Sequence, residues 1–462
     1  MTTDLDAALA YADAHLDDSL DRLKALLRIK SISTDPAYAD QVRRAAEWVV
    51  EDLKSEGFEA SARPTTGHPV VLGHDSSAEN GPHVLFYAHY DVQPVDPLNL
   101  WNSDPFEPQL VRQPDGETHI VARGASDDKG QLLTFLEACR AWRAVAGRLP
   151  LKVSIVSEGE EETGGKSLPG FLEAASAELK ADVALVCDTD LWNADTPSIV
   201  TSLRGLVGEE IEVTCASHDL HSGMYGNAAR NPIQVLADII ASLRNPDGSV
   251  AVEGFYDDVA ELPAEIAEQW KRLPFDEAAF LGGAGLTTPA GEQGRSVLEQ
   301  TRARPTCEIN GITGGYTGDG FKTVIPSKAS AKISFRLVAN QDPQKIRAAF
   351  RAHVEARLPP DAKVTFTEHG GAPGVAVPTD GPYVRKAAAA LSDEWGNEAA
   401  LIGSGGSIPV AGDFKRILGL DTLLIGFARE DDRIHSPNEK YNLSSFHKGI
   451  RSWIRILAAL AE

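Results

Sequence analysis

The chain is poor in positive charge, and it lacks any long apolar run. Its 462 residues include 44 lysines and arginines against 67 aspartates and glutamates, which gives a formal net charge of −23. Nucleic acids and anionic membranes attract basic proteins, so the acidic balance argues against both as partners. No stretch reaches the ~18 consecutive apolar residues of a membrane span, so we expect no membrane association.

Cysteine is scarce as well, and the four cysteines are widely scattered with no C-x-x-C pair. This pattern suggests neither a zinc knuckle nor a disulfide framework. Reduced, buried thiols of this kind are typical of a cytoplasmic protein. The opening stretch "MTTDLDAALAYADAHLDD" is acidic and lacks the basic start and apolar segment of a signal peptide. We therefore expect a cytoplasmic location.

Short apolar runs alternate with helical patterns along most of the chain. Near-continuous apolar strands are typical of sheets covered on both faces, so the pattern predicts an α/β fold with a largely parallel sheet. The length favours two domains. The predicted strands are 83–89, 151–157, 182–188 and 421–427, and the predicted helices are 4–28, 36–56, 129–145, 167–179, 383–395 and 444–461.

The middle of the chain follows a different pattern. Apolar and polar residues alternate over 206–217, 328–338 and 362–368, as in half-exposed antiparallel strands. Helical patterns at 231–244 and 342–357 accompany them. We read an α+β domain over 205–380, inserted into a first domain formed by 1–204 and 381–462. The stretch 250–305 is irregular and rich in proline and glycine, and no elements are assigned to it.

The first strand ends in "FYAHYDVQP" (86–94), which places Asp91 two residues after His89. Residues i and i+2 of an extended chain point the same way. Asp91 can therefore hydrogen-bond one ring nitrogen of His89 and fix its tautomer, as carboxylates do for metal-bound imidazoles. A turn with a surface histidine and a capping aspartate is the alternative.

Two further acidic stretches can also be interpreted either as part of a metal site or as ordinary structural features. In "RGASDDKGQLL" (123–133), an aspartate could cap a helix or present its carboxylate to a metal. In "SEGEEETGG" (157–165), four glutamates fall within five positions behind an apolar strand. Burial makes such crowding costly, and a divalent cation would relieve that cost. One glutamate could then be a ligand and its neighbour a general base; a solvated acidic turn is the alternative.

Together these stretches point to a metal site at the carboxyl ends of the strands, where open α/β sheets bind ligands. "VCDTDLW" (186–192) again sets acids after a strand, and His435 in "DDRIHSPNEKYN" (431–442) follows the last strand. Nitrogen and oxygen ligands from separate elements suit zinc, manganese or cobalt. The number of carboxylates suits two ions that share one.

The order H-x-D, "ASDDKG", "EGEEETGG", "CDTD" and "HSPNEK" resembles the M20 metallopeptidase family, and in particular its dipeptidase branch. "DLHSGMYG", "GGYTGDGFKTVIP", "SFRLVAN" and "GSGGSIPV" resemble that branch as well. The resemblance implies a dinuclear-metal dipeptidase that hydrolyses dipeptides with a free C-terminal carboxylate. It implies two divalent ions per subunit, with zinc as the expected metal and manganese or cobalt as alternatives.

The resemblance also assigns roles to individual residues. It implies that His89 and Asp190 bind one metal, that Glu162 and His435 bind the other, and that Asp127 bridges both. Spacing alone leaves Asp188 and Asp190 equally possible. The remaining implied features are a cis peptide bond after Asp127, Asp91 as the residue that orients His89, and Glu161 as the general base.

The resemblance points to His221 for the oxyanion, and Arg336 together with Gly406 and Ser407 of the glycine-rich loop could hold the substrate carboxylate. A surface histidine, an exposed strand arginine and a linker are the respective alternatives. The inserted domain is expected to act as a lid and to form a homodimer. An M20-type deacylase of N-acyl amino acids is the alternative function, and an inactive peptide- or metal-binding homologue is the alternative of another class.

Overall fold

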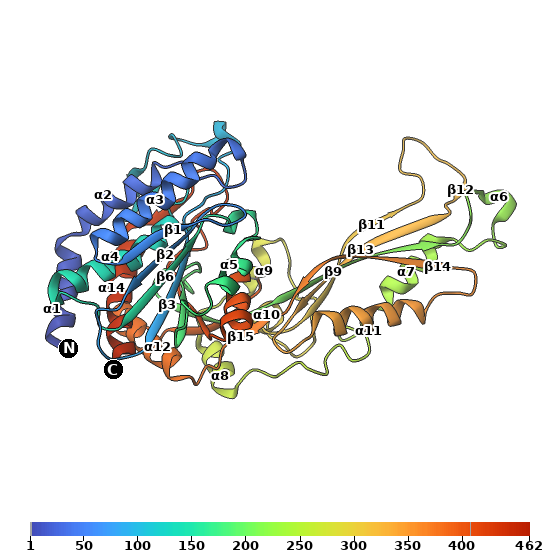
Figure 1. Ribbon diagram of the computed structural model, residues 1–462. Coiled ribbons are helices and arrows are strands. Elements are labelled where there is room, and N and C mark those ends of the chain that lie inside the picture. The colour runs from blue at the N-terminus through green and yellow to red at the C-terminus, as the bar shows by residue number, and fades with distance from the viewer. Residues whose placement is uncertain (1, 407) are drawn as a thin grey trace. The chain divides into compact units, whose positions relative to one another are not determined.

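The computed structural model of the protein describes residues 2–406 and 408–462 (Figure 1). The chain divides into two compact units. Unit 1 comprises residues 1–201, 377–402 and 408–462, and unit 2 comprises residues 202–376 and 403–407. None of the helices in the described ranges combines the length and the apolar composition that a membrane span needs.

A mixed sheet forms the centre of unit 1. Its strands follow the order β1-β2-β6-β3-β7-β17-β8, with β16 beside β8, and β15 pairs with the last two residues of β8. The neighbours β6, β3, β7 and β17 are parallel, whereas the β1–β2, β2–β6 and β17–β8 pairs are antiparallel. The strands are β1 (Glu59–Arg63), β2 (Val70–Asp75), β3 (His83–His89), β6 (Lys152–Glu158), β7 (Val183–Val186), β8 (Ser198–Leu203), β15 (Val375–Ala376), β16 (Ala400–Ser404) and β17 (Thr422–Leu424). Strand β15 and the last two residues of β8 and of β16 belong to unit 2.

The sequence prediction of an α/β fold with a mostly parallel central sheet is confirmed. The central strands are buried along nearly their whole length, which explains why they appear in the sequence as continuous apolar runs. The segment predicted as one helix over 4–28 is instead two helices that meet at His15, where the backbone leaves the helical region.

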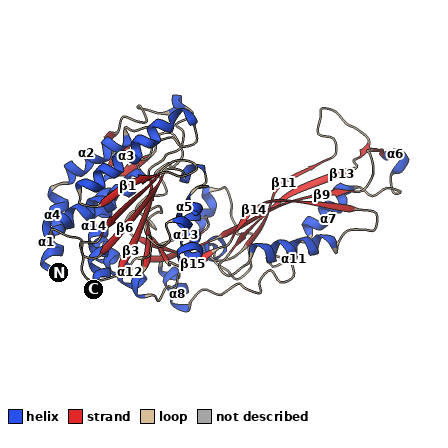
Figure 2. Cartoon of the chain, in the orientation of Figure 1, coloured by secondary structure: helices blue, strands red, loops and turns tan. Residues whose placement is uncertain are grey.

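Helices cover the sheet of unit 1 (Figure 2). They are α1 (Thr2–Ala14), α2 (Leu16–Leu27), α3 (Ala39–Ser55), α4 (Lys129–Ala146), α5 (Leu168–Ala174), α12 (Pro382–Trp395), α13 (Pro409–Asp413) and α14 (Leu443–Ala461). Aromatic rings join three elements of the core. Phe86 of β3 stacks on Phe135 of α4, and Trp453 of α14 meets both rings edge-on.

A smaller sheet in unit 1 is formed by strands from the segments that follow β3 and β17. It has the order β18-β5-β4, with β4 (Gln109–Arg112), β5 (Thr118–Val121) and β18 (Lys440–Asn442). Strand β18 pairs antiparallel with β5, so that Lys440 lies opposite Val121. This pairing brings the loop that precedes β18 next to the loop that follows β5.

Unit 2 contains an antiparallel sheet of order β11-β13-β9-β14 and a short β10–β12 pair. Its strands are β9 (Gly205–Thr214), β10 (Leu220–His221), β11 (Thr306–Gly314), β12 (Val324–Ile325), β13 (Lys328–Leu337) and β14 (Lys363–Ala372). Its helices are α6 (Ser222–Tyr225), α7 (Pro232–Ala241), α8 (Ala264–Arg272), α9 (Glu277–Gly283), α10 (Val297–Arg302) and α11 (Pro343–Glu355). Helices α8, α9 and α10 occupy the stretch 250–305, which the sequence pattern left without elements.

Candidate metal centre

The carboxyl ends of the parallel strands bring several acidic loops to one edge of the sheet. In the register of β3 and β6, His89 lies opposite Glu158, so the two strands end together. Strands β7 and β17 run parallel to β3, so the loops that follow them begin at this same edge. This edge of unit 1 holds the candidate site.

His89 is fully buried, and both of its ring nitrogens face acceptors. Its Nδ1 lies 3.1 Å from the backbone oxygen of Asp91 and 3.3 Å from the Oδ1 of the same residue. Its Nε2 lies 3.0 Å from Oδ1 of Asp127. Oδ2 of Asp91 accepts from Ser33 Oγ at 2.6 Å and from the backbone N–H of Glu162 at 3.1 Å. Asp91 therefore fixes the His89 ring so that Nε2 faces Asp127.

Asp127 stands between the two histidines of the site. Its Oδ2 lies 2.9 Å from Nε2 of His435, and this same nitrogen lies 3.2 Å from Oε2 of Glu162. Glu162 is oriented by Gln93, whose Nε2 donates to Oε2 at 2.6 Å. The peptide bond between Asp127 and Asp128 is cis, as the family resemblance implied.

The electrostatics of Asp127 follow from these contacts. Burial raises the pKa of Asp127, but hydrogen bonds from His435 and His89 outweigh burial and leave the pKa below its ordinary value. Asp127 therefore stays ionised and keeps lone pairs on both oxygens for a cation.

Two groups of side chains offer ligand atoms that all lie within 4.8 Å of one another. One group is His89, Asp127 and Asp188, and the other is Asp127, Glu162 and His435. Imidazole nitrogens and carboxylate oxygens are the donors that zinc, manganese and cobalt accept. Asp127 belongs to both groups and has one oxygen toward each histidine, so the residues fit a pair of divalent ions that share one carboxylate.

The geometry differs from the motif at one ligand position. Asp188 joins His89 and Asp127 in the first group, whereas Asp190 belongs to neither group and is exposed. Strand β7 ends at Val186, and Asp188 lies two residues further along the chain. Asp190 lies further along, where its backbone forms a bridge with Ala428.

Glu161 lies in the one-turn helix Glu161–Thr163 beside the second group. Burial raises the pKa of Glu161, and the carboxylates of Glu162 and Asp127 raise it further against the opposing effect of His89. Glu158, at the end of β6, is buried and accepts from the hydroxyl of Tyr87, and burial raises its pKa to about 8. Of these two glutamates, Glu161 is the one whose carboxylate accepts no hydrogen bond from the described residues.

The predicted substrate contacts belong to unit 2. His221 is exposed, and its Nδ1 accepts from the backbone N–H of Gly223 at 3.0 Å. In the neutral ring, the proton is then on Nε2. Arg336 is half-buried on β13, opposite Leu206 of β9. Gly406 is exposed, and the predicted contact Ser407 lies outside the described residues.

Several residues at these positions carry no motif that singles them out in the sequence. Ser33 lies outside every quoted motif and donates to Asp91 across 58 positions. Gln93 lies within the stretch 86–94, but its contact with Glu162, 69 positions away, was not predicted. Arg204 lies in unit 2, where its Nε donates to the backbone oxygen of Gly405. Burial and the neighbouring charge of Arg336 lower the pKa of Arg204 to about 10.

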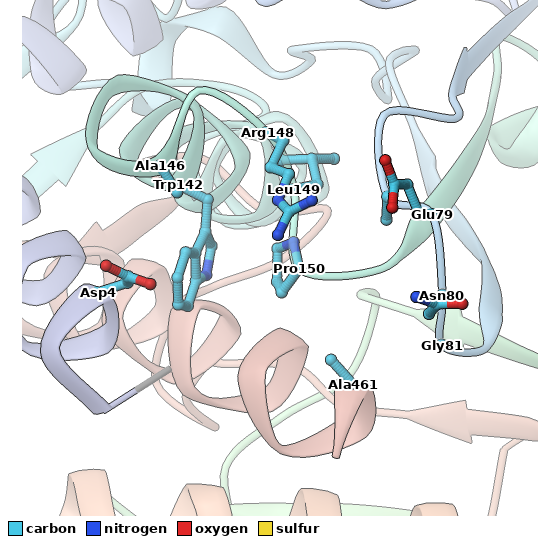
Figure 3. A pocket seen from close by; sticks show the side chains of 11 residues that line it. Asp4, Glu79, Asn80, Gly81, Trp142, Ala146, Arg148, Leu149, Pro150 and Ala461 are labelled. Atoms are coloured by element: carbon cyan, nitrogen blue, oxygen red, sulfur yellow. The ribbon is translucent and has the colours of Figure 1, made fainter.

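A cavity of about 270 Å³ lies at the opposite end of the central strands (Figure 3). Its lining includes Gly81 and Pro150, which precede the starts of β3 and β6, together with Trp142 and Arg148. None of the ligand groups described above contributes to it. The chemistry-bearing residues therefore gather at the carboxyl end of the sheet and not in this cavity.

Comparison with known proteins agrees with this geometry. The chain is 30% identical to the Cys-Gly metallodipeptidase dug1 of Schizosaccharomyces pombe over 100% of this chain and 99% of that protein. It is 28% identical to the human Beta-Ala-His dipeptidase over 99% and 93% of the two chains. The structure of the metallo-carboxypeptidase Sso-CP2 from Sulfolobus solfataricus superposes with a TM-score of 0.78 at 31% identity, covering 96% and 99%.

Residues 85–459 match the family described as Peptidase family M20/M25/M40. This range begins within β3 and ends within α14, so it spans every ligand position of the candidate centre. The protein belongs to peptidase family M20/M25/M40.

Proposed function

We propose that the protein is a metal-dependent dipeptidase that hydrolyses dipeptides with a free C-terminal carboxylate and works with two divalent ions. The observation that carries the proposal is the placement of Asp127 between two ligand groups, with the unbonded carboxylate of Glu161 beside them. Relatives named as dipeptidases over the full chain length support the choice of substrate class.

In this proposal, Asp127 is shared, His435 and Glu162 hold one ion, and His89 holds the other together with an aspartate after β7. Zinc is the proposed metal, and manganese and cobalt suit the same donors. When bound, such ions would polarise a scissile carbonyl and lower the pKa of a bound water molecule.

Glu161 is the proposed general base. It takes a proton from the attacking water and delivers that proton to the leaving amine. Its neighbour Glu162 is committed to His435 and Gln93, whereas Glu161 has no such partner. The proposed roles of ligand for Glu162 and general base for Glu161 explain why these adjacent glutamates differ in their contacts.

The substrate carboxylate is assigned to Arg336 and to the glycine-rich loop that carries Gly406 and Ser407. Arg204 strengthens this assignment, because it adds a second guanidinium near Arg336. Two like charges placed together are stabilised by an anion, and a guanidinium binds a carboxylate through two parallel hydrogen bonds.

His221 is the proposed oxyanion donor, supplied by the partner of a homodimer. Its Nε2 is available as a donor because Nδ1 accepts from Gly223. Within unit 2, β12 and α6 lie at one end of the antiparallel sheet (Figure 1). Large exposed apolar side chains occur in this part of unit 2, namely Met224, Tyr225, Ile312, Tyr316 and Phe321. Exposed apolar side chains are typical of a protein interface.

The first prediction tests the substrate class and the need for metal. Purified protein should hydrolyse dipeptides faster than tripeptides or N-acetyl amino acids, with the released amino acids identified by chromatography. Prolonged chelation should abolish turnover, and zinc, cobalt or manganese should restore it. Preference for N-acetyl amino acids would favour a deacylase. Full activity of protein shown to be metal-free would contradict the two-metal proposal.

The second prediction separates the two glutamates. Glu161→Gln should keep both ions but lower kcat by about 10²–10⁴-fold, because only proton transfer is lost. Glu162→Gln should lower the metal content, because it removes a ligand oxygen. Elemental analysis and steady-state kinetics of the two variants measure the difference. Loss of metal in Glu161→Gln and retention in Glu162→Gln would exchange the two roles.

The third prediction concerns the aspartate that completes the first metal position. We keep Asp190 as the proposed ligand, because the family motif supports it. Asp190→Asn should then lose about one metal equivalent, whereas Asp188→Asn should keep two. Metal analysis of both variants decides. The reverse result would assign the position to Asp188, the residue that lies within the ligand group.

The fourth prediction tests the composite site. His221→Ala and Glu161→Gln should each be nearly inactive alone. After subunit exchange, a mixed dimer contains one site with intact Glu161 from one chain and intact His221 from the other. Activity should reappear, up to about a quarter of the wild-type value for random pairing. Verified exchange without any recovery would show that His221 acts within its own chain or takes no part in catalysis.

A further inference from the structure

The motif that supplies His435 continues with Asn438 and Glu439, and neither residue has a role in the function proposed above. Glu439 is completely buried, with 0% of its surface exposed. A buried carboxylate is costly unless its oxygens are hydrogen-bonded. The partners of Glu439 therefore indicate what it is for.

Four donors surround the Glu439 carboxylate, and all come from residues 123–127. Oε1 accepts from the backbone N–H groups of Ser126 and Asp127, both at 3.0 Å. Oε2 accepts from the backbone N–H of Gly124 at 2.9 Å and from Nη1 of Arg123 at 2.7 Å. A carboxylate offers about four lone-pair sites, so the hydrogen-bonding capacity of Glu439 is filled by one loop.

Further bonds fasten the same two loops. The backbone oxygen of Glu439 accepts from the N–H of Ala122 at 3.2 Å. The hydroxyl of Ser126 donates to Oδ2 of Asp432 at 2.7 Å. The loop 122–128 thus wraps around the loop 429–440. Asp127 comes from the first loop and His435 from the second, and their facing atoms lie 2.9 Å apart.

The network also reaches the segment that follows His89. Nη2 of Arg123 donates to the backbone oxygen of Pro94 at 2.9 Å. Asn438 accepts from the backbone N–H of Asn102 and donates to the backbone oxygen of Leu100, both at 2.8 Å. Two ligand-bearing loops and the segment that follows His89 are therefore joined through Arg123, Asn438 and Glu439.

We propose that Glu439 is a positioning residue that sets the spacing of Asp127 and His435 and thereby the affinity of the metal position they share with Glu162. The proposal rests on the proposed function, because it requires that this group binds a metal. Two of the three ligands of this position lie on loops that Glu439 joins. In the group of His89, only Asp127 does, so loss of Glu439 weakens that position less.

Glu439→Gln is the most direct test. Glutamine has the same shape, but its NH₂ group would face backbone N–H donors that now face an oxygen. Metal affinities of wild type and variant are measured by competition with a chromophoric chelator, and cobalt absorption reports the ligand geometry. We expect one of the two equivalents of metal to bind about 10–100-fold more weakly in the variant, with the other less affected and the cobalt spectrum altered.

A readout without metal separates positioning from ligation. In metal-free protein, amide hydrogen exchange at Gly124, Ser126 and Asp127 should be faster in Glu439→Gln than in wild type, because these N–H groups lose their acceptor. Unchanged exchange together with unchanged metal affinity would overturn the proposal.

Glu137→Gln is the matched control. Glu137 is also a buried carboxylate of unit 1, and it accepts from Ser19 Oγ at 2.8 Å and from Nε of Arg22 at 2.6 Å. It lies within α4 and contacts neither ligand loop. This control should keep wild-type affinity for both ions. An equal loss of metal affinity in Glu137→Gln and Glu439→Gln would show a general effect of destabilisation and overturn the proposal.

A milder variant covers the case in which Glu439→Gln does not fold. Ser126→Ala removes the bond to Asp432 and should weaken the same metal position by a smaller factor, whereas wild-type affinity would overturn the proposal. Wild-type protein that binds no metal would contradict the proposed function itself. Two bound ions in wild type and unaltered binding in the variants would contradict only the role of Glu439.

Discussion

Repulsion between carboxylates at the carboxyl edge of the central sheet is the constraint on which the site depends. Two imidazoles stand among a larger number of acids in these loops, which include Asp91, Asp127, Asp128, Glu158, Glu161, Glu162 and Asp188. Burial raises the pKa of Asp128, Asp188 and Glu158, so keeping them all charged without a counter-ion is unfavourable. Two divalent ions, as proposed, would balance this charge.

The fold limits this repulsion by giving the acids at this edge different hydrogen-bond partners. Asp91 uses one oxygen to orient His89 and the other to hold Ser33 and the backbone of Glu162. A single carboxylate thus links the loop after β3 to the loop after β6. The positions of His89 and Glu162 are coupled through this carboxylate.

Patterns local in the sequence predicted much of this arrangement. The apolar runs predicted β3, β6, β7 and β17, and the resemblance implied the cis bond after Asp127. Contacts between distant segments were not predictable in this way. Ser33 reaches Asp91 across 58 positions, and Glu439 reaches Asp127 across 312. Neither contact has a period or a spacing that marks it in the chain.

The other limits of prediction have separate physical causes. The choice between Asp188 and Asp190 depends on how the chain leaves β7, and alternate residues of an extended chain share a face. Helices α8, α9 and α10 are short and are separated by turns, so they lack the repeated apolar spacing that indicates longer helices. The domain limits and the roles of His221 and Arg336 stay predictions.

The interrupted course of unit 1 has a consequence for biosynthesis. Residues 1–201 leave the ribosome first, but strand β17 and helix α14 follow only after residues 202–376 have been made. At roughly 5–20 residues per second, that delay is on the order of 10 s. During this delay, Phe86 and Phe135 lack their edge-on ring contacts with Trp453. The nascent chain already carries His89, Asp127 and Glu162 but not His435, so a metal captured at this stage would meet only part of the proposed ligand set.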